Sequence, residues 1–307
     1  MKYLVSIDGG GTKTQFYVSD TKGNIVGNYI EGSTNYKSVG VEETYRNIRN
    51  GFEKIYKDLN IEEDDLKCCV FGISGCDSKE DYDQLMNIIL KTGLKEEKVK
   101  LYNDGVLAFY AQADAPGVVI ISGTGSISLG IDKEGNISRA GGWGYNFSDL
   151  GSGYEIGRRG LKEVLLYCDR CIDHTSLFDN ILEHFDIKDF NDLPYEITSI
   201  SDNFEIAKIA SIVVKSAEEN DKLAMNILEE CALELAIISS KLIKDINDDS
   251  NDCINIVLSG GVFNSNLYRE IIIKHINKIS NCKNMKFILQ ENQPVHGGLK
   301  LASKLVK

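Results

Sequence analysis

The sequence has a deficit of basic residues, only three prolines and no long apolar run. Lys and Arg number 34 against 46 Asp and Glu, so the formal net charge at pH 7 is −12. A nucleic-acid or anionic-membrane partner needs a clustered basic face, so we expect neither partner. No segment approaches the ~20 apolar residues of a membrane span, and no signal peptide is apparent. We therefore expect a cytoplasmic protein.

The sequence also lacks a second Cys-x-x-Cys pair. Its eight cysteines are expected to be reduced thiols. Four of them stand in apolar contexts and are expected in the core: Cys68, Cys69, Cys231 and Cys253. Cys168, Cys171 and His174 could share one side of a helix, but a zinc or iron–sulfur site needs a fourth ligand. A structural role is therefore favoured over a metal site.

What is present is a mixed α/β pattern, and 307 residues suffice for two domains. In the first third, apolar runs and helical periods alternate between turn signals. The expected strands are 2–8, 14–20, 25–30, 68–74 and 98–102, and the expected helices are about 41–58, 79–91 and 104–112.

The pattern then starts again and becomes more helical. The expected strands are 117–123, 126–132, 137–141, 254–260 and 285–289. The expected helices are about 153–172, 205–217, 221–245, 265–278 and 294–306, with an acidic loop at 245–252.

Residues 8–27 and 122–141 resemble each other. Both contain a glycine-rich turn between strands, and Asp20-x-x-Gly23-Asn24-Ile25 is repeated letter for letter 112 residues later at Asp132. This repetition favours a duplicated domain. We expect a first domain at 1–113 and a larger second domain at 114–293, with the helix at about 294–307 able to pack back on the first.

Three glycine-rich segments are candidate phosphate or nucleotide loops. In "DGGGTKT" (8–14) the glycines precede a strand, which excludes a Walker loop and a Rossmann fingerprint, since both need a following helix. The turn can be a plain hairpin with glycines at positive φ, or a nest of N–H groups for phosphate, with Asp8 near a hydrated Mg²⁺. Its duplicate "SGTGS" (122–126) favours a phosphate clamp, and "SGGVFN" (259–264) lies where amides can accept a nucleotide.

Two further clusters contain carboxylates. Asp104 follows a strand and begins a helix, so it can be a helix N-cap or a general base. "GGWGYNFSDLGSGYEIG" (141–157) holds the only tryptophan beside Asp149. Such a segment suits a sugar pocket, or it can be a structural turn with a core tryptophan.

In this order, the segments resemble the N-acetylglucosamine kinase-like branch of the BadF/BadG/BcrA/BcrD ATPase family. The resemblance runs from "DGGGTKT" through "NDG", "SGTGS", "GGWG" and "SGGV" to "PVHGGLKLA" (294–302). It implies an α/β fold of two duplicated ribonuclease-H-like (actin-like ATPase) domains with an interdomain cleft. It also implies a homodimer that uses ATP and Mg²⁺ to phosphorylate the 6-hydroxyl of an N-acetylhexosamine.

The resemblance also implies roles for individual residues. Asp104 matches the catalytic base, and Asp8 would serve Mg²⁺ through water. The residues implied for ATP are Gly10, Gly11, Thr12, Thr124, Ala217, Gly260, Gly261 and Asn264. The residues implied for the amino sugar are Asn35, Ser74, Gly75, Asn103, Asp104, Gly125, Trp143, Gly144 and Asp149.

The chain departs from the family pattern at two positions. Leu150 replaces a frequent glutamate, which affects the expected details of sugar recognition, and Asn220 replaces a glycine, an exchange tolerated at positive φ. The alternatives are a glucosamine kinase, a sugar-sensing regulator, or an iron–sulfur ATPase activator. Such activators place a cysteine before the second loop, where this chain has Ile120-Ile121-Ser122, so the kinase is favoured.

Overall fold

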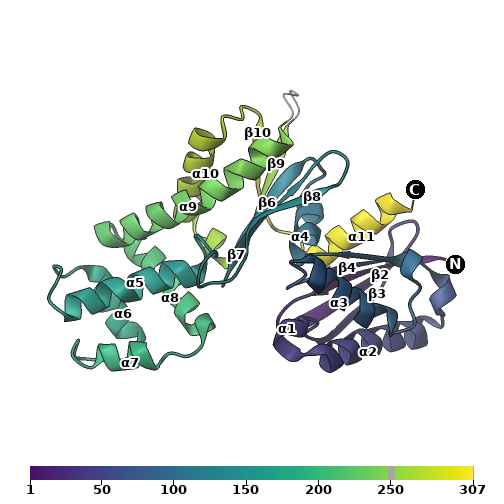
Figure 1. Ribbon diagram of the computed structural model, residues 1–307, viewed down its shortest axis with the longest axis horizontal. Coiled ribbons are helices and arrows are strands. Elements are labelled where there is room, and N and C mark those ends of the chain that lie inside the picture. Colours follow the sequence, from purple (N-terminus) through teal and green to yellow (C-terminus); the bar gives the residue numbers. More distant parts are fainter. Residues whose placement is uncertain (248–252, 307) are drawn as a thin grey trace. The chain divides into compact units, whose positions relative to one another are not determined.

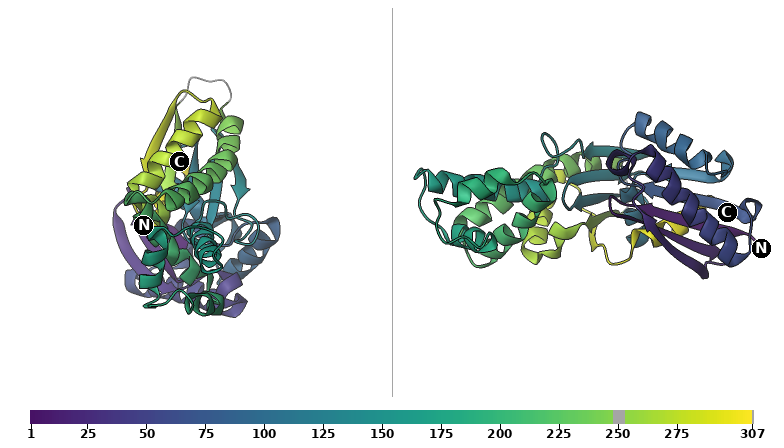
Figure 2. Two further views of the ribbon diagram at one scale, coloured as in Figure 1. Left: turned by 90° about the vertical axis from the view of Figure 1, so that its left-hand side faces the viewer. Right: turned by 90° about the horizontal axis from the view of Figure 1, so that it is seen from below.

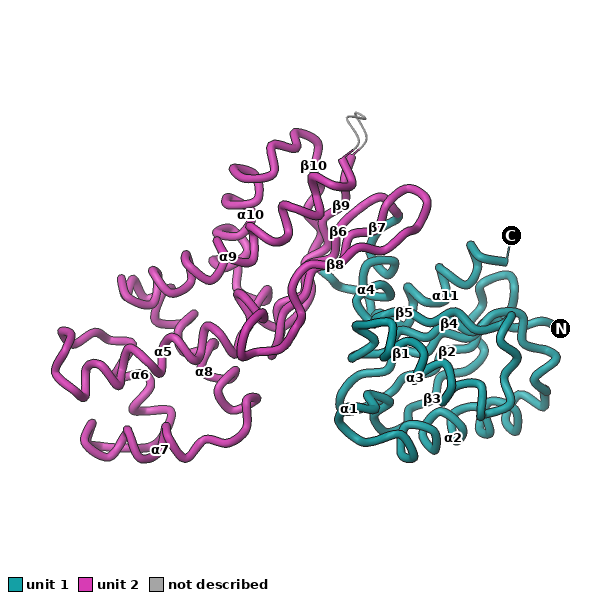
Figure 3. Tube along the Cα trace, in the orientation of Figure 1, with its two compact units in different colours: residues 1–114, 290–307 teal, residues 115–289 magenta. Residues whose placement is uncertain are grey.

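The computed structural model describes residues 1–247 and 253–306, which form two compact units. Residues 1–114 and 290–307 make up the first unit, and residues 115–289 make up the second (Figures 1 and 3). Each unit is built on one five-stranded mixed sheet flanked by helices.

The first sheet has the strand order β3-β2-β1-β4-β5. β2 is antiparallel to its two neighbours, whereas β1, β4 and β5 run parallel to one another. The carboxyl ends of β1, β3, β4 and β5 therefore meet at one edge. The elements of this unit are β1 (Tyr3–Gly9), β2 (Lys13–Asp20), β3 (Ile25–Gly32), α1 (Tyr36–Val39), α2 (Val41–Leu59), β4 (Leu66–Ile73), α3 (Lys79–Leu90), β5 (Val99–Tyr102), α4 (Asp104–Gln112) and α11 (Pro294–Leu305).

The second sheet repeats this topology. Its order β8-β7-β6-β9-β10 corresponds strand for strand to β3-β2-β1-β4-β5, with the same directions. The elements of this unit are β6 (Gly117–Ser122), β7 (Ser126–Ile131), β8 (Ile137–Gly141), α5 (Gly153–Cys168), α6 (Ser176–His184), α7 (Leu193–Ser199), α8 (Asn203–Glu218), α9 (Lys222–Ile246), β9 (Ile254–Ser259), α10 (Asn266–Ser280) and β10 (Met285–Leu289).

The repeated six-residue turn has the same geometry in both units. Asp20 Oδ1 accepts a hydrogen bond from the Asn24 backbone N–H over 2.9 Å, and Asp132 Oδ1 accepts one from Asn136 over 2.8 Å. Gly23 and Gly135 adopt φ of +91° and +86°, which disfavours any other residue there. Equal topology and equal turn geometry confirm the α/β fold of two duplicated domains.

The C-terminal helix α11 belongs to the first unit. It packs against α4 and β1, and the yellow helix lies beside the purple and blue segments in both Figure 1 and Figure 2. Gly297 lies so close to the carbonyl of Leu107 on α4 that a Cβ would overlap it, and Gly298 lies equally close to Ser6 on β1. Glycine at 297 permits the close approach of α11 to α4, and glycine at 298 permits its close approach to β1.

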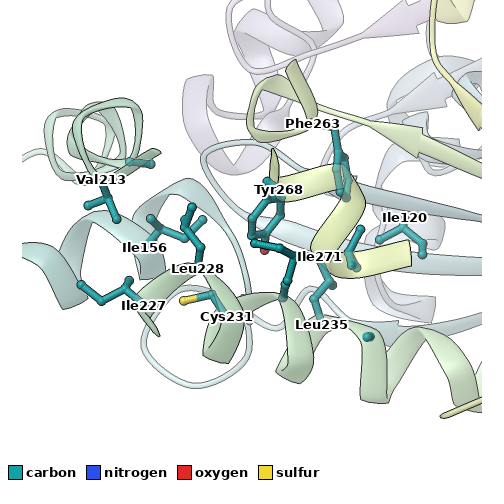
Figure 4. Packing of buried hydrophobic residues seen from close by; sticks show 14 of the residues in the cluster. Ile120, Ile156, Val213, Ile227, Leu228, Cys231, Leu235, Phe263, Tyr268 and Ile271 are labelled. Carbon is teal, nitrogen blue, oxygen red and sulfur yellow. The ribbon is translucent and has the colours of Figure 1, made fainter. Parts of the chain in front are cut away.

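The core of the second unit lies between its sheet and the helices α5, α8, α9 and α10. Ile156, Val213 and Leu228 are fully buried where three of these helices meet (Figure 4). Tyr268 is also fully buried, and its hydroxyl donates a hydrogen bond to the Gly151 carbonyl over 2.9 Å. The core therefore holds the segment that carries Asp149 against α10.

Most expected strands and helices form, with two differences between 153 and 200. The helix expected at 153–172 ends at Cys168, where Asp169 is the C-cap and Arg170 adopts a positive φ of 61°. α6 and α7 were not expected. In α6 the apolar pairs Leu177-Phe178 and Ile181-Leu182 recur at helical spacing and were a missed signal, whereas α7 is only seven residues long. Part of the acidic loop at 245–252 lies outside the described residues. No helix of the described chain is long and apolar enough to cross a membrane.

Candidate functional site

In the first unit, the candidate site residues gather at the edge where β1, β3, β4 and β5 end. In an open α/β sheet this edge is the usual place for a ligand, because loops and helix N-termini meet there. The candidates that lie at this edge are Asp8, Gly10, Gly11, Thr12, Asn35, Ser74, Gly75, Asn103 and Asp104.

The loop between β1 and β2 is a tight hairpin tip. The Gly10 N–H donates to the Lys13 carbonyl over 3.0 Å, and Gly11 and Thr12 are exposed. Neither Gly10 nor Gly11 has a positive φ, so the expectation of positive-φ glycines in a plain hairpin is wrong. A Cβ on Gly11 would meet no atom of the protein within 4 Å. Nothing inside the described fold therefore requires glycine at this position.

Asp104 is the first residue of α4, and Asn103 caps the helix. Asn103 Oδ1 accepts the Gly105 N–H over 2.9 Å, so the alternative that Asp104 is the N-cap is wrong. The Gly105 N–H also lies 3.0 Å from Asp104 Oδ1. Burial, together with the negative charges of Asp8 and Asp77, raises the pKa of Asp104 to about 7. A carboxylate with this pKa can accept a proton near neutral pH.

Asp8 lies on β1 near its carboxyl end and is half-buried. Burial raises its pKa to about 6, while the charge of Lys13 acts in the opposite direction. A cation beside Asp8 would offset the cost of its buried charge. Within the described residues, no group of three or more His, Cys, Asp or Glu side chains is arranged to hold a metal ion.

Three loops of the first unit are linked around these carboxylates. Asn35 caps α1, and its Oδ1 lies 3.0 Å from the place of a Cβ on Gly75. The Ser74 N–H donates to the Gly9 carbonyl over 2.8 Å, and Asn103 Nδ2 donates to Asp77 over 3.0 Å. The residues expected at a sugar site are thus connected through backbone and side-chain contacts. Sequence reasoning did not select Asp77, because one aspartate after a strand carries no motif.

In the second unit, the loop between β6 and β7 lies against the start of α5. The Gly153 N–H donates to the Gly123 carbonyl over 2.8 Å, and the Tyr154 N–H donates to the Thr124 carbonyl over 3.1 Å. The hydroxyls of Ser122 and Ser126 both donate to backbone carbonyls of the Leu150–Gly151 segment over 2.7 Å. These two serines therefore have structural partners, whereas Thr124 lines a pocket.

The "SGGVFN" segment lies directly beside this loop. Gly260 adopts a φ of +101°, and a Cβ there would overlap the Ser122 carbonyl. Gly261 begins a short 3₁₀-helix that ends at Asn264, and both residues are exposed. Ala217, near the end of α8, is buried, and its neighbour Glu218 accepts a hydrogen bond from Ser265 over 3.2 Å. The two loops thus form one continuous wall.

This wall borders a pocket of about 770 Å³ that belongs entirely to the second unit. Thr124, Gly261 and Asn264, which the resemblance implies for ATP, line it together with one face of α8 and Gly153 of α5. Sequence reasoning missed the α8 residues Phe204, Ala207, Lys208, Ala210, Ser211, Val214 and Glu218. Their spacing along one helix face was a signal, but it did not distinguish a pocket wall from a core face.

Asp149 lies on the other side of the Thr124 loop. Its side chain is only 8% exposed, Oδ1 accepts the Gly144 N–H over 3.2 Å, and Oδ2 lies close to Gly125. Asp149 also lines a second pocket of about 360 Å³, which includes Tyr154 on α5. Because Gly153 lines the larger pocket and Tyr154 the smaller, the first turn of α5 separates the two.

Trp143 is exposed over 69% of its surface, so the alternative of a core tryptophan is wrong. The Arg139 guanidinium stacks on its ring at 3.5 Å from the centroid. Tyr145 and Phe147 are exposed as well. An exposed aromatic cluster beside a buried carboxylate is a common arrangement in sugar-binding sites.

The cysteines carry no comparable site. Cys168, Cys171 and His174 lie beyond or at the end of α5 and bond to three different partners, namely Phe190, Asp169 and Asp179. The sequence suggested that these three residues could share one side of a helix, but in the structure they do not. Cys68, Cys69 and Cys231 are buried as expected, whereas Cys253 is exposed.

The chain is similar over nearly its whole length to known proteins. The model of the BadF/BadG/BcrA/BcrD ATPase family matches residues 5–297. The chain belongs to this family. It is 30% identical over 305 residues to an N-acetylmuramic acid/N-acetylglucosamine kinase of Clostridium acetobutylicum, with 98% of each chain covered. It is also 30% identical over 314 residues to an N-acetyl-D-glucosamine kinase of Dictyostelium discoideum, with 97% of each covered.

A solved structure supports the fold. A protein of Chromobacterium violaceum described as a putative N-acetylglucosamine kinase superposes with a TM-score of 0.74 at 19% identity. The superposition covers 98% of this chain and 99% of that one. The likeness in sequence is too low to carry a function, but it extends over both units of the fold.

Proposed function

We propose that this protein is an ATP-dependent kinase that phosphorylates the 6-hydroxyl of an N-acetylhexosamine, either N-acetylglucosamine or N-acetylmuramic acid. One observation carries the proposal most directly. Asp104 begins a helix at the carboxyl edge of its sheet, follows the N-cap residue Asn103, and has its pKa raised by burial to about 7. This is the state that a general base needs near neutral pH. The relatives named as amino-sugar kinases support the same reading.

In the proposed reaction, Asp104 accepts the proton of the sugar hydroxyl. The hydroxyl oxygen forms a bond to the γ-phosphorus of ATP, and the bond from that phosphorus to the β,γ-bridging oxygen breaks. The products are the sugar 6-phosphate and ADP, and the proton remains on Asp104 until solvent removes it. Little covalent chemistry is needed from the protein in such a transfer, so positioning and charge provide most of the catalysis.

Each unit has loops with residues proposed for ATP. Gly10, Gly11 and Thr12 would hold the terminal phosphates, and Thr124 would provide the second phosphate loop. Gly260, Gly261 and Asn264 would border the adenosine, with Ala217 closing the pocket behind them. The pocket of about 770 Å³ beside Thr124 and Gly261 has room for a nucleotide.

Three glycines give independent support for these loops. Gly11, Gly123 and Gly261 have no positive φ, and a Cβ on any of them would meet no protein atom within 4 Å. Most glycines with so much space around them in this chain have a positive φ that explains them, as at Gly23. A glycine without an internal reason fits a loop that a ligand approaches closely.

Mg²⁺ would be held through water by Asp8, together with oxygens of the bound phosphates. The half-buried carboxylate with its raised pKa fits a nearby cation, and few other protein ligands are available around it. When bound, Mg²⁺ would neutralise part of the charge on the phosphate chain.

The residues proposed for the sugar form two sets, one around Asp104 in the first unit and one around Asp149 in the second. In the first unit they are Asn35, Ser74, Gly75 and Asn103. In the second unit they are Gly125, Trp143, Gly144 and Asp149. Trp143 would cover an apolar face of the sugar ring, and Asp149 would accept hydrogen bonds from its hydroxyls.

An ADP-release assay over a panel of sugars tests the proposal. We expect turnover with N-acetylglucosamine or N-acetylmuramic acid and little with glucose, and the panel includes glucosamine as the alternative substrate. Asp104→Asn should lower kcat by about 10³-fold or more, while sugar binding measured by calorimetry is largely retained. Near-normal turnover of this variant would remove Asp104 from its role as the base. A preference for glucosamine would change the substrate but not the reaction.

A further inference from the structure

Asp77 lies between β4 and α3, at the edge of the first sheet that also carries Asp8 and Asp104. Its side chain is 24% exposed. Asn103 Nδ2 donates a hydrogen bond to Asp77 Oδ1 over 3.0 Å, and the Lys37 ammonium lies 3.6 Å from Oδ2. Asp77 therefore bonds to the side chain of Asn103, the N-cap residue of α4.

Asn103 connects Asp77 to the proposed base. Its Oδ1 accepts the Gly105 N–H over 2.9 Å and caps α4, whose first residue is Asp104. The amide has one donor end and one acceptor end. Since the donor end bonds to the Asp77 carboxylate, the acceptor end must face the helix. The bond to Asp77 thus selects the orientation in which Asn103 Oδ1 can cap α4, where it shares the Gly105 N–H with Asp104 Oδ1.

The backbone around Asp77 is itself well held. The N–H groups of Asp77 and Ser78 both donate to Asp81 Oδ2, over 3.1 and 2.9 Å. Asp81 also accepts bonds from Tyr36 and Lys37 on α1. Asp77 is therefore part of a fixed network between α1, α3 and α4, and its position does not depend on an exposed loop.

We propose that Asp77 is a positioning residue for Asp104, which orients Asn103 to cap α4 and makes Asp104 a stronger base through its negative charge. The proposal rests on the proposed role of Asp104 as the general base. It adds a second carboxylate, which acts on Asp104 through Asn103 and through its charge.

The charged and titratable groups around Asp104 support this role. Asp8 on β1 and Asp77 both raise its pKa, and the Cys76 thiol lies near enough to respond to the charge of Asp104. Lys37 on α1 pairs with Asp77 and Asp81. The cations of α11, Lys300 and Lys304, pair with Asp114 beyond the opposite end of α4.

Two substitutions separate the hydrogen bond from the charge. Asp77→Asn keeps an oxygen that can accept the Asn103 amide but removes the charge, whereas Asp77→Ala removes both. Asp83→Asn, on the exposed face of α3, is the matched control. For each variant, kcat and the sugar KM are measured from pH 5 to pH 9.

For Asp77→Asn we expect the acidic limb of the pH–rate profile to move down by about half a unit to one unit, with the sugar KM nearly unchanged. We expect Asp77→Ala to lose a further tenfold or more in kcat, because α4 loses the oriented cap. Asp83→Asn should match the wild type. An acidic limb of Asp77→Asn that coincides with that of the wild type would overturn the proposal, and so would equal kcat values for the two Asp77 variants.

A second measurement does not depend on turnover. The pKa of Asp104 can be followed by ¹³C NMR of labelled aspartate in the wild type and in Asp77→Asn, with Asp104→Asn to assign the signal. A lower pKa in Asp77→Asn supports the proposal, and an unchanged pKa overturns it. If Asp104→Asn keeps normal turnover, the proposed role of Asp104 as the base fails, and the titration still reports whether Asp77 acts on Asp104.

Discussion

Gly125 in the glycine loop of the second unit lies directly against the Asp149 side chain. A Cβ on Gly125 would lie 2.6 Å from Asp149 Oδ2. No real side chain tolerates this distance, so Gly125→Ala must displace the carboxylate. We expect the sugar KM to rise about tenfold or more, since small displacements of a positioning group are costly, while the ATP KM changes little. Steady-state kinetics with each substrate varied in turn checks this.

Gly123→Ala is the matched substitution two residues earlier. Its Cβ would meet no protein atom within 4 Å and its φ is not positive, so the fold should be at least as stable as the wild type. If a phosphate approaches this loop, the ATP KM should rise about tenfold while the sugar KM stays near its normal value. An unchanged ATP KM in this variant would contradict the proposed phosphate loop.

The raised pKa of Asp104 predicts a change of stability with pH. Its folded pKa is about 7 against an ordinary value of 3.8, so the folded state binds more protons between these values. The free energy of unfolding of the wild type should therefore fall as pH rises through this window. Asp104→Asn removes this cost, and Asn103 still caps α4. We expect the variant to exceed the wild type by up to about 4 kcal/mol at pH 8 and to match it near pH 4.

Urea unfolding of both proteins at pH 4 and pH 8 measures the difference. Asp83→Asn serves as the control, since its carboxylate lies on the exposed face of α3. An equal difference between Asp104→Asn and the wild type at the two pH values would show that Asp104 titrates normally in the folded protein.

Trp143→Ala tests whether the exposed ring binds sugar. Because Trp143 is 69% exposed and its main partner is Arg139, truncation should cost about 1 kcal/mol of stability or less. The sugar KM should rise far more than the ATP KM. A parallel rise of both would mean that Trp143 acts on the structure of its loop rather than on the sugar.

Much of the fold could be predicted, because local patterns and tertiary structure agree. The apolar run of β1, the apolar residues of β2 and the Asp20 turn predict the strands of the first sheet, and the repeated turn at Asp132 predicted a second sheet of the same topology. The apolar pairs of α6 were a signal that the sequence reading missed. α7 could not be found in this way, because it is seven residues long and packs on α5, which lies earlier in the chain.

The sequence predicted where the candidate site residues lie along the strands and helices, but not which residues they contact. The sequence placed Asp104 at the start of a helix, yet it could not show that Asn103, one residue earlier, is the cap. Likewise, Ser122 and Thr124 looked equivalent in the glycine loop. Only the tertiary structure shows that the Ser122 hydroxyl bonds to Gly151 whereas Thr124 lines a pocket. Such assignments depend on partners far away in the chain.

Gly297→Ala tests the packing that joins β1, which carries Asp8, to α4, which carries Asp104. In an isolated helix this change would stabilise by about 1 kcal/mol. Here the new Cβ would overlap the Leu107 carbonyl and lie 2.5 Å from the Ala111 nitrogen, both of them backbone atoms. We therefore expect a loss of about 2–3 kcal/mol in urea unfolding, and a lower kcat because α4 shifts. Ser303→Ala on the same helix should change stability by less than about 0.5 kcal/mol. A Gly297→Ala protein as stable as the wild type would mean that α11 does not pack this closely in solution.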